Sequence, residues 1–264
     1  MSVKYGYLAV EGPHDLAFAG QLLKLHGLER VKMYPRLDAF WRPLVPTKFP
    51  HQDDLLKRVP VPIFFASATH SIAVHTVGGD SSFAKTIKDS LDVLYMGGEP
   101  PLTGLGILLD ADSKDSPAKR HAELLQELGS PTYPIPLAFP STPGAVSGAP
   151  IHCGIFVLPD NQSQGTLEAL LLECAKSVYP TLEAGARTYV ELARGAKELV
   201  KADRKDLDKP AGRDKAMVAC IAAVLRPGKA IQVSIQDNRW IEPPLAQFPR
   251  ITAIDDFFVS LFEL

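Results

Sequence analysis

Short apolar runs alternate with segments of helical periodicity along the first two thirds of the chain. Residues 5–10 form an apolar run that ends at Glu11, and leucine and alanine then recur at helical spacing through residues 16–25. This succession is repeated with strands predicted at 71–77, 104–109 and 151–158 and helices predicted at 82–96, 117–128 and 166–175. Four strand–helix units predict an α/β fold, with a mostly parallel sheet and helices on both faces.

Two proline-rich stretches interrupt this pattern. Residues 34–62 contain six prolines, and residues 129–150 are rich in Pro, Gly and Ser, so neither stretch predicts a central strand. We expect both to be insertions in a domain of residues 1–180, the first with one short helix at 53–58. The β-rich segments 63–66 and 71–77 predict a hairpin after the first insertion.

The last third of the chain has a different pattern. Helices are predicted at 183–200 and 214–225, and the apolar residues near the C-terminus predict a final helix that closes the core. We therefore expect residues 181–264 to form a helical C-terminal extension packed on the α/β domain. Basic residues are frequent between 194 and 215, but acids are interleaved with them. This stretch fits a solvated helical face at least as well as a strip that binds nucleic acid.

Composition narrows the class of protein. The chain has 264 residues, of which 46% are hydrophobic, and its 28 Lys and Arg against 30 Asp and Glu give a formal net charge of −2. These values are typical of a globular protein and do not by themselves indicate a polyanionic partner. The three cysteines form no CxxC pair, which favours a reducing compartment. With no long apolar run and no leader pattern, we expect a cytoplasmic protein without membrane contact.

Acidic residues follow several of the predicted strands. In open α/β sheets, functional groups collect at the carboxyl ends of the strands, so these acids should come close together. Grouped carboxylates repel one another, and a divalent cation relieves the repulsion; oxygen ligands without His or Cys suit Mg²⁺ or Mn²⁺. The candidate metal ligands are Glu11, Asp15, Asp110, Asp112, Asp160 and Glu168. Taken singly, each acid is more typical of a turn or of the first turn of a helix.

These motifs resemble the Toprim domain, which is found in topoisomerases, DnaG-type primases and OLD-family nucleases. The resemblance rests on Glu11-Gly12 after the first strand and Asp110-Ala111-Asp112 after the third parallel strand. The likeness is closer to the OLD-like branch and to small stand-alone bacterial Toprim proteins, because Asp15, the Gly165-Thr-Leu-Glu168 sequence and a downstream Lys215 match that branch. It implies a Toprim-like sheet that carries Pro-rich insertions and a helical C-terminal extension.

The resemblance also implies a function. We expect Mg²⁺- or Mn²⁺-dependent hydrolysis of phosphodiesters, with Glu11 and Lys215 as catalytic residues and with Gly12, Gly78, Gly79 and Lys114 contacting the substrate. DNA is favoured over RNA as the substrate. An ATPase partner chain is conceivable because the chain has no GxxxxGK[ST] motif of its own, and a homodimer is compatible with the sequence.

Other interpretations remain open at this point. A Toprim fold can serve as a metal-binding or partner-recruiting scaffold without catalysis, in nucleic-acid metabolism or phage defence. A phosphatase of the haloacid-dehalogenase type would use Asp110 as nucleophile and Asp112 as acid, although that motif normally follows the first strand. Hydrolysis of a phosphodiester in the presence of a divalent cation separates the enzyme from the scaffold.

Overall fold

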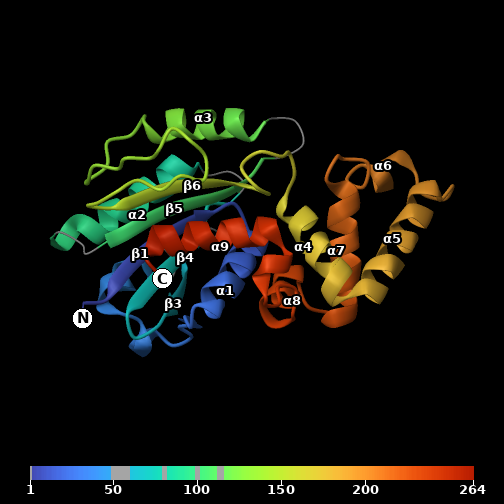
Figure 1. Cartoon of the computed structure of the whole chain (residues 1–264), viewed down its shortest axis with the longest axis horizontal. Coiled ribbons are helices and arrows are strands. Elements are labelled where there is room, and N and C mark those ends of the chain that lie inside the picture. Colours follow the sequence, from blue (N-terminus) through green and yellow to red (C-terminus); the bar gives the residue numbers. More distant parts are fainter. Residues whose placement is uncertain (1, 49–59, 79–81, 99–101, 112–115) are drawn as a thin grey trace.

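The computed structural model describes residues 2–48, 60–78, 82–98, 102–111 and 116–264. A six-stranded sheet in the order β2-β3-β4-β1-β5-β6 forms its centre (Figure 1). Four strands are parallel: β1 (Lys4–Val10), β4 (His70–Thr76), β5 (Leu102–Asp110) and β6 (His152–Leu158). The predicted α/β class and mostly parallel sheet are confirmed.

The remaining two strands are antiparallel and lie at one edge of the sheet. β3 (Ile63–Ala66) pairs with β4 as the predicted hairpin, and the two-residue β2 (Glu29–Arg30) pairs with β3. β2 was not predicted, because a strand of two residues has no periodicity to detect. It exists only through its pairing with β3.

Helices cover both faces of the sheet. The helices α1 (Pro13–Leu25) and α9 (Pro249–Phe262) pack on one face, and α2 (Phe83–Leu94) and α3 (Pro117–Leu128) pack on the other (Figure 1). Side chains of β1 alternate between the two cores, with Leu8 facing α1 and α9 and Tyr7 facing α2. This alternation follows from the pleat of a strand, which points successive side chains to opposite faces.

The helices that follow the sheet form a lobe at one end of it. They are α4 (Leu167–Val178), α5 (Pro180–Gly195), the short α6 (Lys201–Arg204), α7 (Gly212–Leu225) and α8 (Ile231–Asp237) (Figure 1). The lobe and the α1–α9 face share one continuous hydrophobic core. The helix predicted at 183–200 corresponds to α5, which begins and ends several residues earlier. The helix α8 was not predicted.

The C-terminal helix α9 returns to the sheet across two glycines of β5. A Cβ on Gly104 would lie 2.4 Å from the Leu261 carbonyl oxygen, and a Cβ on Gly106 would lie 2.3 Å from Leu261 Cδ2. The absence of side chains at these positions lets the helix approach the strand closely. The C-terminal part of the chain thus completes the core of the sheet.

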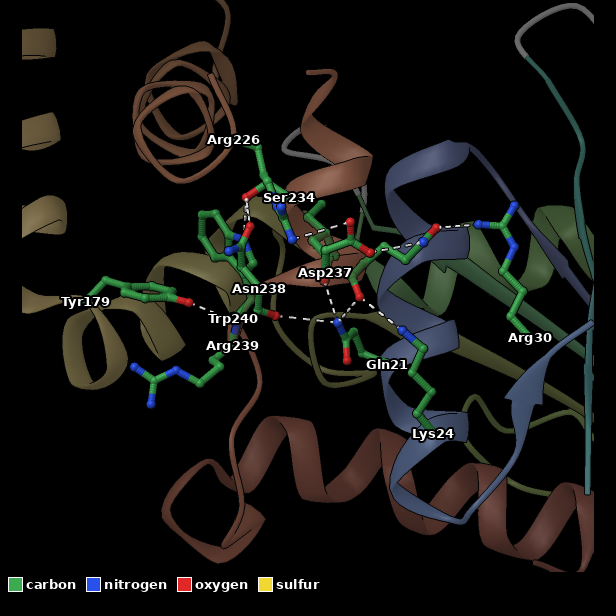
Figure 2. A network of polar contacts seen from close by, with 12 residues as sticks. Gln21, Lys24, Arg30, Tyr179, Arg226, Ser234, Asp237, Asn238, Arg239 and Trp240 are labelled. Carbon is green, nitrogen blue, oxygen red and sulfur yellow. Dashed lines mark hydrogen bonds and ion pairs between the residues drawn. The ribbon is translucent and has the colours of Figure 1, made fainter. Parts of the chain in front are cut away.

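A polar network fixes the lobe to α1 (Figure 2). Gln21 on α1 donates through Nε2 to the carbonyl oxygens of Ile235, at 2.8 Å, and Gln236, at 2.5 Å. Lys24 Nζ donates to the same Gln236 oxygen at 3.0 Å. These carbonyls belong to the last turn of α8, which has no intrahelical donors for them, so α1 caps α8.

The two proline-rich insertions have little regular structure. The first holds two short 3-10 segments, η1 (Tyr34–Arg36) and η2 (Ala39–Leu44), and buries Trp41, whose indole nitrogen donates to Ser71 Oγ at 2.9 Å. The short helix expected at 53–58 lies outside the described residues. In the second insertion, residues 129–150 contain no helix or strand, as predicted. Two further 3-10 segments are η3 (Tyr95–Gly97) and η4 (Leu245–Gln247).

Candidate functional site

A cavity of about 540 Å³ lies at the carboxyl ends of the parallel strands. It opens at the end of β1, between β4 and β5. At β1 the strand order changes direction, because β2, β3 and β4 lie on one side of this strand and β5 and β6 lie on the other. Ligands of open α/β sheets bind at such a position. The cavity is lined by seven of the predicted site residues: Glu11, Gly12, Asp15, Gly78, Asp110, Glu168 and Lys215.

The sheet register brings the first two acids together. Val10 pairs with Leu108, so Glu11, which follows β1, and Asp110, which ends β5, leave the same edge of the sheet. Gly78, after β4, adopts the left-handed conformation with a φ of +78° and donates its amide to the Glu11 carbonyl oxygen at 3.3 Å. The strand ends therefore form one wall of the cavity.

Helix N-termini hold three of the carboxylates around the cavity. Asp15 Oδ2 accepts from the Gly12 amide, Asp110 Oδ1 accepts from the Leu167 amide, and Glu127 Oε1 accepts from the Ala84 amide, each at 2.9 Å. These amides belong to the first turns of α1, α4 and α2 or to the residue before them. The free N–H groups and positive dipole end of a helix stabilise negative charge.

This stabilisation is incomplete for two of the acids. Burial and the charge of Glu11 raise the pKa of Asp15 to about 7, despite the hydrogen bond from Gly12. Loss of solvation raises the pKa of Asp110 well above its usual range, and the charges of Asp15, Glu11 and Glu168 add to this. Without a cation, the site resists holding all of its carboxylates ionised.

Glu168 has the opposite behaviour. Burial alone would raise its pKa, but contacts from His14 and Lys215 lower the pKa to about 2. Lys215 Nζ donates to Glu168 Oε1 at 3.1 Å, whereas His14 Nδ1 lies 3.7 Å from the same oxygen, which is too long for a hydrogen bond. Glu168 is 3% exposed, and its Oε2 has no hydrogen-bond partner among the described residues. A buried, ionised oxygen without a partner is suited to accept a ligand.

The chemistry of these acids fits a hard divalent cation such as Mg²⁺ or Mn²⁺. Within the described ranges, no three His, Cys, Asp or Glu side chains already converge as a metal-binding group. Asp112, the predicted partner of Asp110, lies outside the described residues, as do Gly79 and Lys114. A metal would require the side chains of Asp15, Asp110 and Glu168 to turn toward a common point.

The structure does not bring Asp160 to this cavity, contrary to the prediction. Asp160 folds back on its own turn after β6, where it accepts from the amide of Ser163 at 2.6 Å, and it pairs with Arg250 Nε of α9 at 2.9 Å. β6 is the edge strand, separated from β1 by β5. Asp160 therefore stabilises its own turn and the start of α9.

Two charged residues that the sequence reasoning missed lie in the cavity wall. Arg120 donates to Glu11 Oε1 at 3.2 Å, and Glu127 caps α2. Both come from α3, one at its start and the other at its end. The sequence predicts the helix that carries them. It does not predict which side of that helix faces the cavity, because this depends on tertiary packing.

Comparison with known proteins places the chain in a family. Residues 5–263 match the family described as a protein of unknown function, DUF3226. The chain belongs to the DUF3226 family. No curated protein matches this DUF3226 chain.

One solved structure is similar to this DUF3226 chain. It is a hypothetical protein from Pyrococcus horikoshii OT3, with 16% sequence identity and a TM-score of 0.54, covering 98% of this chain and 95% of that chain. At this identity the likeness shows the fold alone. Within the described residues, none of the helices is long and apolar enough to cross a membrane.

Proposed function

We propose that this cavity hydrolyses phosphodiesters with the help of Mg²⁺ or Mn²⁺. The observation that carries the proposal is Glu168 Oε2, a buried carboxylate oxygen without a partner in a wall shared with Asp15 and Asp110. Burial and the mutual repulsion of these acids raise the pKa values of Asp15 and Asp110, and a cation would stabilise the ionised carboxylates. Glu11 completes the proposed set of ligands among the described residues.

The residues of the cavity divide the chemistry between them. A divalent cation bound by the acids would lower the pKa of a coordinated water and neutralise charge on the phosphate. Lys215 has a side chain that is 56% exposed, and its Nζ can donate to a phosphate oxygen while remaining beside Glu168. Arg120, on α3, offers a second positive charge next to Glu11. The cavity thus combines carboxylates that could bind a cation with two cationic side chains that could contact a phosphate.

The Toprim resemblance supports the same proposal. It assigns metal binding to Glu11, Asp15, Asp110 and Glu168, and it assigns a catalytic role to Lys215; all five line the cavity. Asp160 leaves the proposed ligand set because Arg250 holds it elsewhere. The proposals of a nucleic-acid substrate, an ATPase partner chain and a homodimer rest on the resemblance or on the sequence alone.

Hydrolysis of bis(p-nitrophenyl) phosphate by the purified full chain tests the function. We expect turnover with Mn²⁺ or Mg²⁺, none with EDTA, and loss of turnover in Glu168→Gln. Glu173→Gln is the matched control, since Glu173 lies on the same helix and pairs with Arg250 instead of lining the cavity. Cation binding by calorimetry without any hydrolysis would favour the scaffold interpretation. If the chain neither binds the cation nor hydrolyses the substrate, the proposed metal site is refuted.

A further inference from the structure

Several basic residues of the stretch 194–215 pair with acids of the helical lobe. Arg204 pairs with Asp208 at 3.3 Å and Lys209 pairs with Asp206 at 2.6 Å. Arg213 Nε lies 2.5 Å from Glu191 Oε1. A protein that follows a nucleic-acid backbone needs cations free to neutralise successive phosphates. These paired residues favour a solvated helical surface over a strip that binds nucleic acid, which the sequence had left open.

The described part of the cavity wall carries few positive charges for a polyanion. Among its described lining residues, five are acidic and two, Arg120 and Lys215, are Lys or Arg. Each of the two already contacts an acid: Arg120 contacts Glu11 at 3.2 Å and Lys215 contacts Glu168 at 3.1 Å. This charge balance suits one phosphate group bridged by a cation. It disfavours a long row of phosphates lying across the mouth.

The size of the cavity points in the same direction. Its volume of about 540 Å³ falls within the roughly 300–1,000 Å³ of sites that enclose small molecules. Apolar side chains of Val77, Phe83 and Leu167 also contribute to the lining, beside the charged groups. They can contact the organic groups on either side of a phosphate, which a surface that binds only the backbone of a duplex would not need.

We infer that the site takes a small phosphodiester, of about dinucleotide size, and not the interior of a nucleic-acid duplex. This inference rests on the proposed function, whose chemistry it keeps, and it specifies the substrate. The phosphate lies between Arg120 and Lys215, and the flanking groups lie against the apolar lining. A duplex would have to bind outside the cavity, over a lobe whose basic residues are largely paired.

The test compares two probes, a thymidine dinucleotide and a short DNA duplex, with Mn²⁺ and the full chain. We expect kcat/KM for the dinucleotide to exceed that for the duplex, per phosphodiester bond, by about tenfold or more. For the duplex we also expect binding to depend only weakly on salt, with a log–log slope of about −1 to −2 if Arg120 and Lys215 alone contact phosphates, where a protein contacting many phosphates gives a steeper slope. Faster cleavage of the duplex overturns the inference and leaves the proposed function standing.

A binding measurement distinguishes failure of the proposed hydrolytic function from failure of the inferred substrate class. Fluorescent versions of both probes are titrated with Glu168→Gln and with the wild-type chain in Ca²⁺. Binding of the dinucleotide without hydrolysis under any condition would refute the proposed function and keep the inferred ligand class. If neither probe binds, the inference is wrong.

A variant of the lobe provides the control for surface binding. Combined Arg204→Gln and Lys209→Gln substitutions remove positive charge from two residues that do not line the cavity. We expect kcat/KM for the dinucleotide to stay within about twofold of wild type, since surface ion pairs contribute little. A tenfold or larger loss of duplex binding in this variant, together with duplex cleavage by the wild type, would assign the lobe to nucleic acid and overturn the inference.

Discussion

Replacing Asp15 by Asn should stabilise the metal-free protein at alkaline pH. Asp15 is 8% exposed, and burial together with the charge of Glu11 raises its pKa from 3.8 to about 7. One pKa unit corresponds to about 1.4 kcal/mol, so keeping this carboxylate ionised costs the fold on the order of 4 kcal/mol above pH 7. Asn keeps an oxygen that can accept from the Gly12 amide, at 2.9 Å in the wild type, but it carries no charge.

The sign of the pH dependence follows from proton linkage. The folded protein holds the Asp15 proton up to about pH 7, whereas the unfolded chain releases it near its usual pKa of 3.8. The folded state binds more protons within this window, so the Asp15 contribution to stability is fully present below it and is lost as the pH rises to about 7. The advantage of Asp15→Asn should therefore be largest above pH 7 and should shrink toward pH 4.

Urea unfolding with EDTA over a pH series measures this effect. Allowing for imperfect geometry of the amide, we expect Asp15→Asn to gain about 1–3 kcal/mol of unfolding free energy near pH 8. Adding Mg²⁺ or Mn²⁺ should offset most or all of this advantage, because a cation at 100 times its Kd stabilises the wild type by about 2.7 kcal/mol. A variant that is less stable than the wild type near pH 8 with EDTA would refute the electrostatic reasoning.

Three further substitutions test separate parts of the structure. Gly104→Ala should cost about 1–3 kcal/mol in urea unfolding because its Cβ would meet the Leu261 carbonyl oxygen at 2.4 Å, while Gly148→Ala, with nothing within 4 Å, should have little effect. Lys215→Met should lower kcat for bis(p-nitrophenyl) phosphate by about 100-fold and keep the stabilisation by Mn²⁺; unchanged kcat would remove Lys215 from catalysis. Asp160→Asn should keep hydrolysis and lose about 1 kcal/mol of stability with the partly exposed Arg250 pair, and loss of metal binding in this variant would contradict its place outside the cavity.

The central elements could be predicted because the signals that define them are local. α3 occupies the predicted residues 117–128, since Ser116 Oγ accepts from the Lys119 amide at its start and Pro117 suits the first turn. The limits of α5 were less visible. Pro180 begins it and Gly195 ends it, although the apolar periodicity appeared to run from 183 to 200.

The site could be predicted only where strand topology decides it. Glu11 and Asp110 end neighbouring parallel strands, so their proximity follows from the fold class. Asp160 ends a parallel strand too, but its partner Arg250 is ninety residues farther along the chain on α9. No local sequence pattern predicts such a long-range contact. The contact of Arg120 with Glu11 could not be predicted for the same reason.

The helical extension is part of the candidate site, because Lys215 comes from α7 while its partner Glu168 comes from α4. The position of α7 depends on α8, which packs beside it and is capped by Gln21 of α1. α1 also carries Asp15. The same helix therefore positions one acid of the cavity and, through α8, restrains the helix α7 that carries Lys215. Moving α7 away from α4 would leave Glu168 buried without Lys215, and an unpaired buried charge is costly. The geometry of the cavity is therefore coupled to the packing of residues 181–264 on the sheet.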